Sequence, residues 1–307
     1  MLDVASATAT VFIDGEAGTT GLLIRERLGA HRRVRLLSVP EASRKDSGAR
    51  KEAMAQADLA VLCLPDDAAK ESVALADSLP GGGPRILDAS TAHRVAAGWV
   101  YGFPELSPAQ AEAVRSARRV SNPGCYPTGA IALIRPLVDA GLIPADYPVT
   151  VNAVSGYSGG GKSMIAAYEG GTAPSFELYG LGLQHKHLPE LHKFSGLSRR
   201  PIFVPSVGNF RQGMLISVPL HLETLPGKPK ASDLQAALEA RQVPKDAPVY
   251  FLCQSGGRSK IAATQCAGLG YSASYNIAEG FEGALDEHKH RNSISGWKVA
   301  GLPWTQT

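Results

Sequence analysis

The chain has 307 residues with a formal net charge of +3, and 44% of its residues are hydrophobic while 19% are charged. A soluble globular protein is expected, since no apolar run approaches the roughly 20 residues that a membrane-spanning helix needs. The small charge, without any long basic run, excludes nucleic acid and membrane surfaces as expected partners.

The first residues, MLDVASATATVFIDG, lack the basic segment and apolar core of a secretory signal, so we expect a cytoplasmic protein. Residues 8–14 are apolar and β-branched, which predicts a strand, and residues 19–31 show helical spacing. The alternation continues, with strands predicted over 33–39, 58–64 and 84–90 and helices over 47–57 and 66–79. This order indicates an α/β fold with a Rossmann-type, doubly wound parallel sheet.

From about residue 148 the pattern changes to longer strand candidates separated by glycine-rich loops. The candidate strands cover residues 147–158, 200–207, 213–223 and 247–254, and a helix is predicted over 232–242. This half is therefore predicted to be a mixed α+β domain. A last helix is predicted over residues 276–291, and the length of the chain suits two domains.

The first predicted strand runs into the segment IDGEAGTTG, which places glycines at three-residue intervals. Without a Cβ, glycine lets the backbone approach a pyrophosphate, whose charge is attracted by the free amides of the following helix N-terminus. The candidate cofactor ligands are Gly15, Gly18, Thr19, Thr20 and Gly21. The spacing GxxGxxG differs from the common GxGxxG, so a tight connection without a ligand is the alternative.

The tip of the second predicted strand is basic. NAD enzymes commonly carry an acid there for the ribose hydroxyls, whereas this chain offers Ser43, Arg44 and Lys45, which suit a 2′-phosphate. This favours NADP as the cofactor, and Glu41 nearby is the feature that would suit NAD. Solvated surface charge is the alternative for Arg44 and Lys45.

The cysteines form no CxxC pair and lie near no histidine cluster, so no structural metal is expected; they occupy positions 63, 125, 253 and 266. Cys63 and Cys253 fall in apolar strand patterns, where cysteine acts as a small buried hydrophobic residue. Cys125, in SNPGCYPTG, instead follows a Pro-Gly turn and precedes a proline suited to the first turn of a helix. At a helix N-terminus, the dipole and free amides should lower the thiol pKa and could hold an oxyanion.

A nucleophilic thiolate gains from an imidazole that can accept and return its proton. The segment QHKHLPELH supplies His185 and His187, which would share one face of a strand. Glu190 lies one helical turn from His187 and could orient an imidazole. An exposed loop without catalytic function is the alternative. In combination with the glycine turn and Cys125, the segment favours catalytic residues here.

These segments resemble a known family. SNPGCYPTG is similar to the active-site signature of the N-acetyl-γ-glutamyl-phosphate reductases, and HKHLPEL resembles the HxHxxE segment of that family. GEAGTTG, ASRK, DASTAHR, YGFPEL and VSGYSGGGK occur in the expected order, so the resemblance spans nearly the whole chain, whose length is that of the compact type. The cysteine signature is specific to the family, and the glycine turn is not.

The resemblance implies NADPH-dependent reductive dephosphorylation of N-acetyl-γ-glutamyl phosphate to the semialdehyde, a step of arginine biosynthesis. Cys125 would attack the acyl phosphate, phosphate would leave, and the thioester would accept a hydride. A histidine would act as general acid and base. Spacing leaves both His185 and His187 open for this role, with Glu190 orienting the imidazole.

The resemblance also implies substrate contacts. Ser90 and Arg94 lie at the carboxyl end of a predicted strand, and Asn122 lies in the cysteine signature. Arg94 could bind phosphate or carboxylate through two hydrogen bonds, and an ordinary surface arginine is the alternative. The residues TAH depart from the longer type of the family, which typically has an aspartate and an aromatic residue there.

Two further segments are assigned to the cofactor by the resemblance. Ser155, Gly156, Ser158 and Gly159 would form a flexible, amide-rich cofactor loop, for which an ordinary glycine turn is the alternative. Asn276 would hydrogen-bond the carboxamide of the nicotinamide, although an asparagine before a helix commonly caps it.

The wider family, which includes aspartate-semialdehyde and glyceraldehyde-phosphate dehydrogenases, implies a discontinuous first domain. Residues 1–124 and 280–307 would form the NADP-binding Rossmann domain, and residues 125–279 the α+β catalytic and oligomerisation domain. A homo-oligomer, dimer or tetramer, is expected because the strand-rich domain could supply a sheet face or edge.

Two other functions are compatible with the sequence. One is the reduction of a related acyl phosphate, such as aspartyl phosphate or a carrier-linked glutamyl or aminoadipyl phosphate. The other is a nucleotide-binding regulator without catalysis, since one fold hosts many functions. The combination of Cys125 with two histidines and a glutamate argues against the regulator.

Overall fold

A computed structural model describes residues 8–240 and shorter segments beyond them, namely 249–251, 260, 264, 267–268, 274–276, 284, 286–290, 293–295 and 299–300. The chain forms two compact units, Met1–Leu238 and Glu239–Thr307. None of the described helices is both long and apolar enough to cross a membrane.

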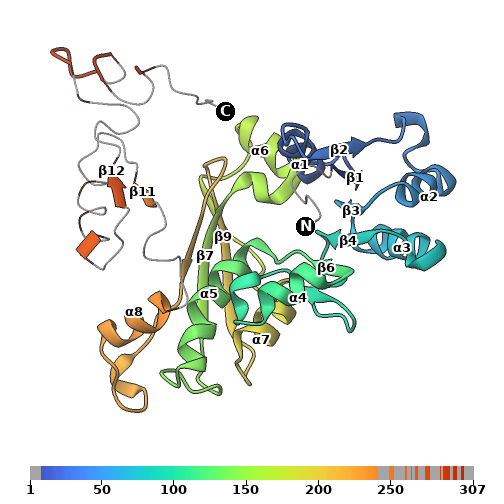
Figure 1. Cartoon of the computed structure of the whole chain (residues 1–307). Coiled ribbons are helices and arrows are strands. Elements are labelled where there is room, and N and C mark those ends of the chain that lie inside the picture. The colour runs from blue at the N-terminus through green and yellow to red at the C-terminus, as the bar shows by residue number, and fades with distance from the viewer. Residues whose placement is uncertain are drawn as a thin grey trace. The chain divides into compact units, whose positions relative to one another are not determined.

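The first unit contains a parallel six-stranded sheet in the order β2-β1-β3-β4-β6-β5 (Figure 1). Its strands are β1 Ala9–Asp14, β2 Val34–Leu37, β3 Leu59–Leu62, β4 Arg85–Asp88, β5 Val100–Tyr101 and β6 Arg119–Ser121. The helices that connect them are α1 Thr19–Gly29, α2 Ser47–Ala55, α3 Asp66–Asp77 and α4 Gln110–Ser116. The predicted order of strands and helices is confirmed from β1 to β4, whereas β5, α4 and β6 were not predicted.

Helices cover both faces of this sheet because its interior strand β1 is buried on both sides. Phe12 of β1 packs in a core cluster with Met54 of α2 and Ala69 of α3. Its neighbours Val11 and Ile13 point to the opposite face and pack with residues of α1. Successive side chains of a strand alternate between faces, so a continuous apolar run needs cover on both. The predicted doubly wound architecture is confirmed.

A second sheet follows, with four strands in the order β10-β7-β9-β8. These are β7 Thr150–Gly156, β8 Phe176–Leu178, β9 Ile202–Gly208 and β10 Met214–Ser217, where only the pair β7 and β9 is parallel. The helices of this region are α5 Cys125–Asp139, α6 Gly161–Glu169, α7 Leu188–Ser195 and α8 Ala231–Glu239. The predicted mixed α+β region is confirmed. The strand expected over 213–223 ends at Ser217, shortly before Pro219, which has no N–H for a ladder.

One face of the second sheet is packed and the other carries exposed apolar side chains. Phe203 of β9 and Val151 of β7 belong to a core cluster with Ile131 of α5 and Leu191 of α7. The register places Leu178, Ser206, Val154 and Leu215 in one row across the four strands, on the opposite face. The exposed fractions on this outer face are 54% for Phe176, 49% for Leu178, 50% for Ile202 and 61% for Leu215.

In the second unit, β11 Val249–Phe251 pairs in parallel with β12 Ser274–Asn276. The helix predicted over 276–291 is wrong for the described residues 286–290, which form a turn. The Asp286 side chain accepts hydrogen bonds from the N–H groups of His288 and His290 and from the Ser293 hydroxyl. Such local bonds compete with helical ones, and Lys289 has a φ of 64°.

Candidate active site

The predicted glycine turn connects β1 to α1. Gly15 has a φ of 89°, and a Cβ there would lie 2.4 Å from the carbonyl oxygen of Cys63 at the end of β3. Gly18 closes the turn, with its N–H donating to the Gly15 carbonyl at 3.0 Å, and it precedes the first residue of α1. Glycine is therefore required at position 15 both by conformation and by space.

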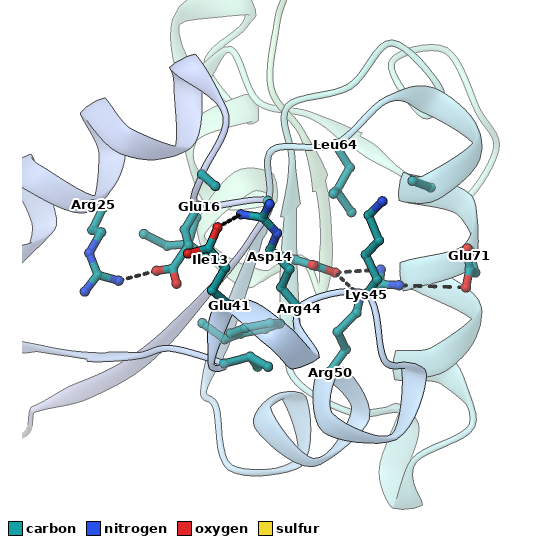
Figure 2. Close-up of a pocket in the computed structure, with 15 residues that line it drawn as sticks. Ile13, Asp14, Glu16, Arg25, Glu41, Arg44, Lys45, Arg50, Leu64 and Glu71 are labelled. Atoms are coloured by element: carbon teal, nitrogen blue, oxygen red, sulfur yellow. Dashed lines mark hydrogen bonds and ion pairs between the residues drawn. The ribbon is translucent and has the colours of Figure 1, made fainter.

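A pocket of about 670 Å³ lies beside this turn, and it is lined by Phe12 to Ala17, Arg25, Val39, Glu41, Arg44, Lys45, Arg50, Leu64, Ala68 and Glu71. Figure 2 shows the charged side chains around it, with Arg25 paired to Glu16 and Arg44 to Glu41. Two predicted cations, Arg44 and Lys45, thus reach the same space as Gly15. The pocket has the size and the polarity of a nucleotide site at the carboxyl end of a parallel sheet.

Not all predicted cofactor residues line this pocket. Ser43 ends the short 3₁₀ helix η1, Glu41–Ser43, and is half-buried, but it is not one of the lining residues. Thr19, Thr20 and Gly21 form the first turn of α1, where their amides face the end of the glycine turn by position. The side chain of Asn276 lies outside the described part of the chain.

The floor of the pocket is a buried ion pair that the sequence interpretation missed. Arg50 of α2 donates to Asp14 Oδ2 through Nε at 3.1 Å and Nη2 at 2.8 Å, and Ser72 of α3 donates to the same oxygen at 2.5 Å. These contacts tie β1 to the two helices on one face of the sheet. The cluster can be identified only from the folded structure, because Asp14, Arg50 and Ser72 lie in separate segments of the sequence.

The predicted cofactor loop is mostly regular structure. Ser155 and Gly156 end β7, Ser158 and Gly159 lie in the 3₁₀ helix η4 Tyr157–Gly160, and α6 follows at once. A Cβ on Gly156 would lie 2.6 Å from the Arg211 carbonyl oxygen, so the segment packs tightly against its neighbour. Lys162 donates to the carbonyl of Ala17 in the glycine turn at 3.2 Å. This contact places the start of α6 beside the glycine turn and the pocket that the turn lines.

Cys125 is the first residue of α5, as predicted, and it is exposed. The residue before it, Gly124, is buried among charged side chains. A Cβ on Gly124 would lie 2.6 Å from Arg94 Nη1, 2.6 Å from Glu190 Oε1 and 2.8 Å from His187 Nε2. Three predicted site residues thus meet at the turn that carries the thiol.

Glu190 holds the turn rather than an imidazole. Its Oε2 accepts the Gly124 N–H at 2.9 Å and the Tyr101 hydroxyl at 2.7 Å, and its Oε1 accepts Arg94 Nη1 at 2.6 Å. The carboxylate is 1% exposed, and these charge-assisted bonds offset the cost of burying it. The sequence interpretation expected Glu190 to orient a histidine and missed Tyr101, which lies in YGFPEL.

The two histidines lie in a loop, so the shared face that they would have in a strand does not arise. His187 precedes α7 and is 5% exposed, while His185 is half-buried. His185 Nδ1 accepts the His187 N–H at 3.2 Å, and the two ring centroids are 4.7 Å apart. Both rings pack edge-on against Tyr126 of α5. Nδ1 of His187 is buried without a hydrogen-bond partner among the described residues.

Burial controls the ionisation of the site. Although Cys125 as a residue is exposed, surrounding protein atoms desolvate its sulfur and raise the pKa of the thiol, and the backbone amides of Tyr126 and Cys125 and the charge of Arg94 oppose this change. Burial also lowers the pKa of His187 to about 3, with contributions from His185, Arg94 and Lys186. The predicted lowering of the thiol pKa is wrong for the protein without ligands, because desolvation outweighs the helix N-terminus. Thiol and imidazole are therefore both neutral at pH 7.

The predicted substrate residues surround the same turn. Arg94 is 9% exposed, and its Nε donates to the carbonyl of Asn122 at 3.0 Å. The hydroxyl of Ser90 donates a hydrogen bond to the buried Asp88 carboxylate at 2.7 Å, so the hydroxyl hydrogen already has an intramolecular acceptor. Asn122 is exposed, and its N–H donates to the carbonyl of Asp88 at 2.7 Å.

The residues TAH of the same loop are fixed by internal contacts. His93 Nδ1 lies 2.6 Å from Asp88 Oδ2, and its ring stacks on Trp99 with centroids 4.1 Å apart. Thr91 bonds the Asp66 carboxylate through its N–H and its hydroxyl. These contacts set the course of the loop that brings Arg94 to Glu190.

The comparisons with known proteins agree with this geometry. Residues 125–265 match the family model of the semialdehyde dehydrogenase dimerisation domain. The chain is 58% identical over 233 residues to the N-acetyl-γ-glutamyl-phosphate reductase of Chelativorans sp., covering 75% of this chain and 74% of the relative. It is 55% identical over 258 residues to N-acetyl-γ-glutamyl-phosphate reductase 2 of Pseudomonas putida, covering 83% and 82%.

Solved structures share the fold at low sequence identity. Aspartate semialdehyde dehydrogenase II of Vibrio cholerae, complexed with ASA, matches with a TM-score of 0.55 at 16% identity over 82% of this chain and 86% of that chain. Aspartate semialdehyde dehydrogenase of Candida albicans with NADP matches with a TM-score of 0.53 at 14% identity over 82% and 84%. At these sequence identities, the two structures show only that the chain shares their fold.

Proposed function

The chain belongs to the N-acetyl-γ-glutamyl-phosphate reductase family, and from this premise we propose that it reduces N-acetyl-γ-glutamyl phosphate to N-acetylglutamate semialdehyde, with release of phosphate, in arginine biosynthesis. The observation that carries the proposal is the turn at Gly124. It brings an exposed cysteine at a helix N-terminus together with Arg94, Glu190 and His187. An acyl phosphate reductase needs such a nucleophile beside an acid-base group and a cation.

NADP is the cofactor that the pocket fits best. Gly15 keeps the turn beside β1 free of a side chain, and the pocket there is lined by Arg44 and Lys45. Two cations suit a 2′-phosphate better than the hydroxyls of NAD. Bound NADPH would supply the hydride. Gly18, Ser43, Ser155, Gly156, Ser158, Gly159 and the first turn of α1 remain proposed cofactor contacts, together with Asn276.

The chemistry begins with the Cys125 sulfur attacking the acyl carbon while its proton moves to an imidazole. The carbon–oxygen bond to phosphate then breaks, and the phosphate leaves with the electron pair. The amides at the start of α5 point toward the developing oxyanion. After hydride arrives at the thioester carbon, the carbon–sulfur bond breaks, and Cys125 leaves as a thiolate that can take back the proton.

We assign the acid-base role to His187, with His185 as its neighbour. Nε2 of His187 is directed at the turn before Cys125, whereas Nδ1 of His185 is occupied by a backbone N–H. A neutral imidazole is the form that accepts a proton, and the lowered pKa keeps His187 in that form at pH 7. A bound phosphate dianion would raise this pKa, since an opposite charge nearby favours the protonated ring.

Arg94, with Ser90 and Asn122, is proposed to face the substrate. The guanidinium of Arg94 lies within the cluster around Gly124, so its charge acts where the phosphate departs. Residues 1–124 and 280–307 would form the NADP-binding domain and residues 125–279 the catalytic and oligomerisation domain. The reaction would take place in the cytoplasm, where NADPH is regenerated.

A homo-oligomer is part of the proposal. The matched family model is described as a dimerisation domain, and it covers the second sheet. The outer face of that sheet exposes Phe176, Leu178, Ile202 and Leu215. We propose that a second copy of the chain covers this face, because exposed apolar patches of this kind mark protein interfaces.

The reverse reaction tests the function directly. Purified protein is incubated with phosphate, NADP and either N-acetylglutamate semialdehyde, aspartate semialdehyde or a carrier-linked glutamate semialdehyde, and NADPH formation is followed. The proposal expects the highest kcat/KM with N-acetylglutamate semialdehyde, lower values with NAD, and no reaction by Cys125→Ser. A preference for another semialdehyde would make the protein a reductase of that acyl phosphate, and no turnover with any of them would favour the regulator.

A further inference from the structure

We infer that Tyr101 is a positioning residue for Cys125, acting through Glu190, and this inference rests on the proposed function. The Tyr101 hydroxyl and the Gly124 N–H donate to the same oxygen, Oε2 of Glu190, at 2.7 and 2.9 Å. The phenol therefore sets the position of the carboxylate oxygen that anchors the turn before the nucleophile.

The backbone and the ring of Tyr101 are both fixed by the fold, the backbone by pairing with β6 and the ring by stacking on α7. It is 2% exposed, and it pairs in register with Ser121 at the end of β6, which leads directly into the cysteine turn. Its ring stacks on Phe194, with centroids 3.9 Å apart and an interplanar angle of 12°. Phe194 lies on α7 one helical turn beyond Glu190. The ring and the hydroxyl of Tyr101 therefore contact the same face of that helix.

The hydroxyl is a permanent donor. Burial and the Glu190 carboxylate both raise the pKa of Tyr101, so the phenol stays protonated across the working pH range. Arg94 occupies the other oxygen, Oε1, at 2.6 Å. Because both carboxylate oxygens of Glu190 are hydrogen-bonded, the carboxylate is fixed in one orientation. The Gly124 N–H therefore binds at a fixed position.

The charge of Glu190 also acts on the thiol. The negative charge of Glu190 raises the pKa of the Cys125 thiol. A hydroxyl that donates to the carboxylate withdraws part of its negative charge. Removal of that hydroxyl should therefore raise the Cys125 pKa further, and a looser turn would add to this by moving the sulfur from the amides of α5.

The experiment replaces Tyr101 by Phe, which keeps the ring and its stacking. Tyr147→Phe serves as the matched control, because within the described part of the chain the hydroxyl of this half-buried residue only accepts a 3.4 Å hydrogen bond from the His221 N–H. We expect Tyr101→Phe to lower kcat about tenfold with the KM for NADPH within twofold of the unchanged enzyme. The pH dependence of Cys125 alkylation by iodoacetamide should shift to higher pH, while Tyr147→Phe should change neither quantity.

A double-mutant cycle tests whether Tyr101 acts through Glu190. In a Glu190→Gln background, Tyr101→Phe should cost less than twofold in kcat, since the charged acceptor is already absent. An equal loss in both backgrounds, an unchanged alkylation profile, or a Tyr101→Phe enzyme with normal kcat would each overturn the inference.

Thermal unfolding of each variant separates a local effect from misfolding. The alkylation profile needs no substrate, so it tests the positioning of Cys125 even if the proposed reaction fails. Loss of turnover by the unchanged protein with every semialdehyde would count against the proposed function alone.

Discussion

At the residue scale, the site is determined by the competition between desolvation and local donors at Cys125. The helix N-terminus and Arg94 lower the thiol pKa, and burial raises it by more. The result is a neutral thiol next to a turn that a neutral imidazole also approaches, and we propose that the two groups exchange a proton when substrate binds. A cysteine at a helix start is therefore not by itself a thiolate, because the neighbouring protein atoms can desolvate the sulfur even where the residue remains exposed.

The alkylation rate of Cys125 should follow this pKa. Below the pKa the rate should rise tenfold for each pH unit, with a midpoint above the value of about 8.5 for a free thiol. Cys63, whose pKa is raised to about 11, should react more slowly at every pH below that value. Peptide mass spectrometry after iodoacetamide treatment measures both rates, with Cys125→Ser as the control. A midpoint at or below pH 7 would contradict the desolvation argument.

The stability of the fold should depend on the protonation of His187. Its pKa is lowered from 6.5 to about 3, chiefly by burial. Below pH 6.5 the unfolded chain binds a proton that the folded chain refuses, so stability is lost as the pH falls from 6.5 toward 3. Denaturant unfolding between pH 7 and 4.5 should show a steeper decline for the unchanged protein than for His187→Asn. Parallel pH curves would exclude this contribution.

At the element scale, the proposed nucleotide pocket depends on the connection between β1 and α1. Continuous apolar runs predict strands, and the sequence pattern located β1, β3 and β4 within two residues of each end. The glycines that follow β1 were correctly expected to form a turn. The positive φ of Gly15 and its close approach to the Cys63 carbonyl become visible only in the folded structure, because Cys63 follows the neighbouring strand β3 and is far from Gly15 in the sequence.

Gly15→Ala should disrupt this connection. A left-handed conformation costs a residue with a Cβ about 1–2 kcal/mol, and the contact with the Cys63 carbonyl adds to this cost. The Kd for NADPH, measured by fluorescence titration, should rise at least tenfold. Gly29→Ala is the matched control at the other end of α1, where a Cβ would meet only Leu36 Cδ1 at 3.8 Å. Equal Kd values for the two variants would refute the role of Gly15.

At the scale of the whole molecule, the outer face of the second sheet carries apolar side chains that are exposed in the described part of the chain. The alternation along β7 and β9 places the core on one side and Ile202 on the other, where it is 50% exposed. Burying such a face needs a second surface with the same apolar character. A two-fold dimer supplies one, since both partners then present identical patches.

Replacement of Leu178 and Leu215 by Lys should convert the proposed oligomer to a monomer. Each lysine would place a desolvated charge in the proposed interface, which is strongly unfavourable without a partner. Size-exclusion chromatography with light scattering gives the mass directly. Val95→Lys, at a residue with 38% exposure outside the second sheet, should leave the mass unchanged. An oligomer that survives both leucine replacements must use another surface.

The sequence by itself determined the order of the elements from β1 to β4, the fold class, the start of α5 at Cys125 and most of the residues that could carry the chemistry. These depend on local patterns, such as apolar periodicity and turn residues, which act within a few positions along the chain. The helix predicted over 276–291 failed where the Asp286 side chain competes for the backbone.

Only the tertiary structure decided what these residues do to one another. The partners of Glu190 come from positions 66, 89 and 96 residues away in the chain, and no local pattern fixes such pairings. The direction of the Cys125 pKa likewise depends on how much water the surrounding segments remove from the sulfur. Hydrogen-bond partners and solvation are properties of packed space, whereas spacing along the chain records only which groups are available.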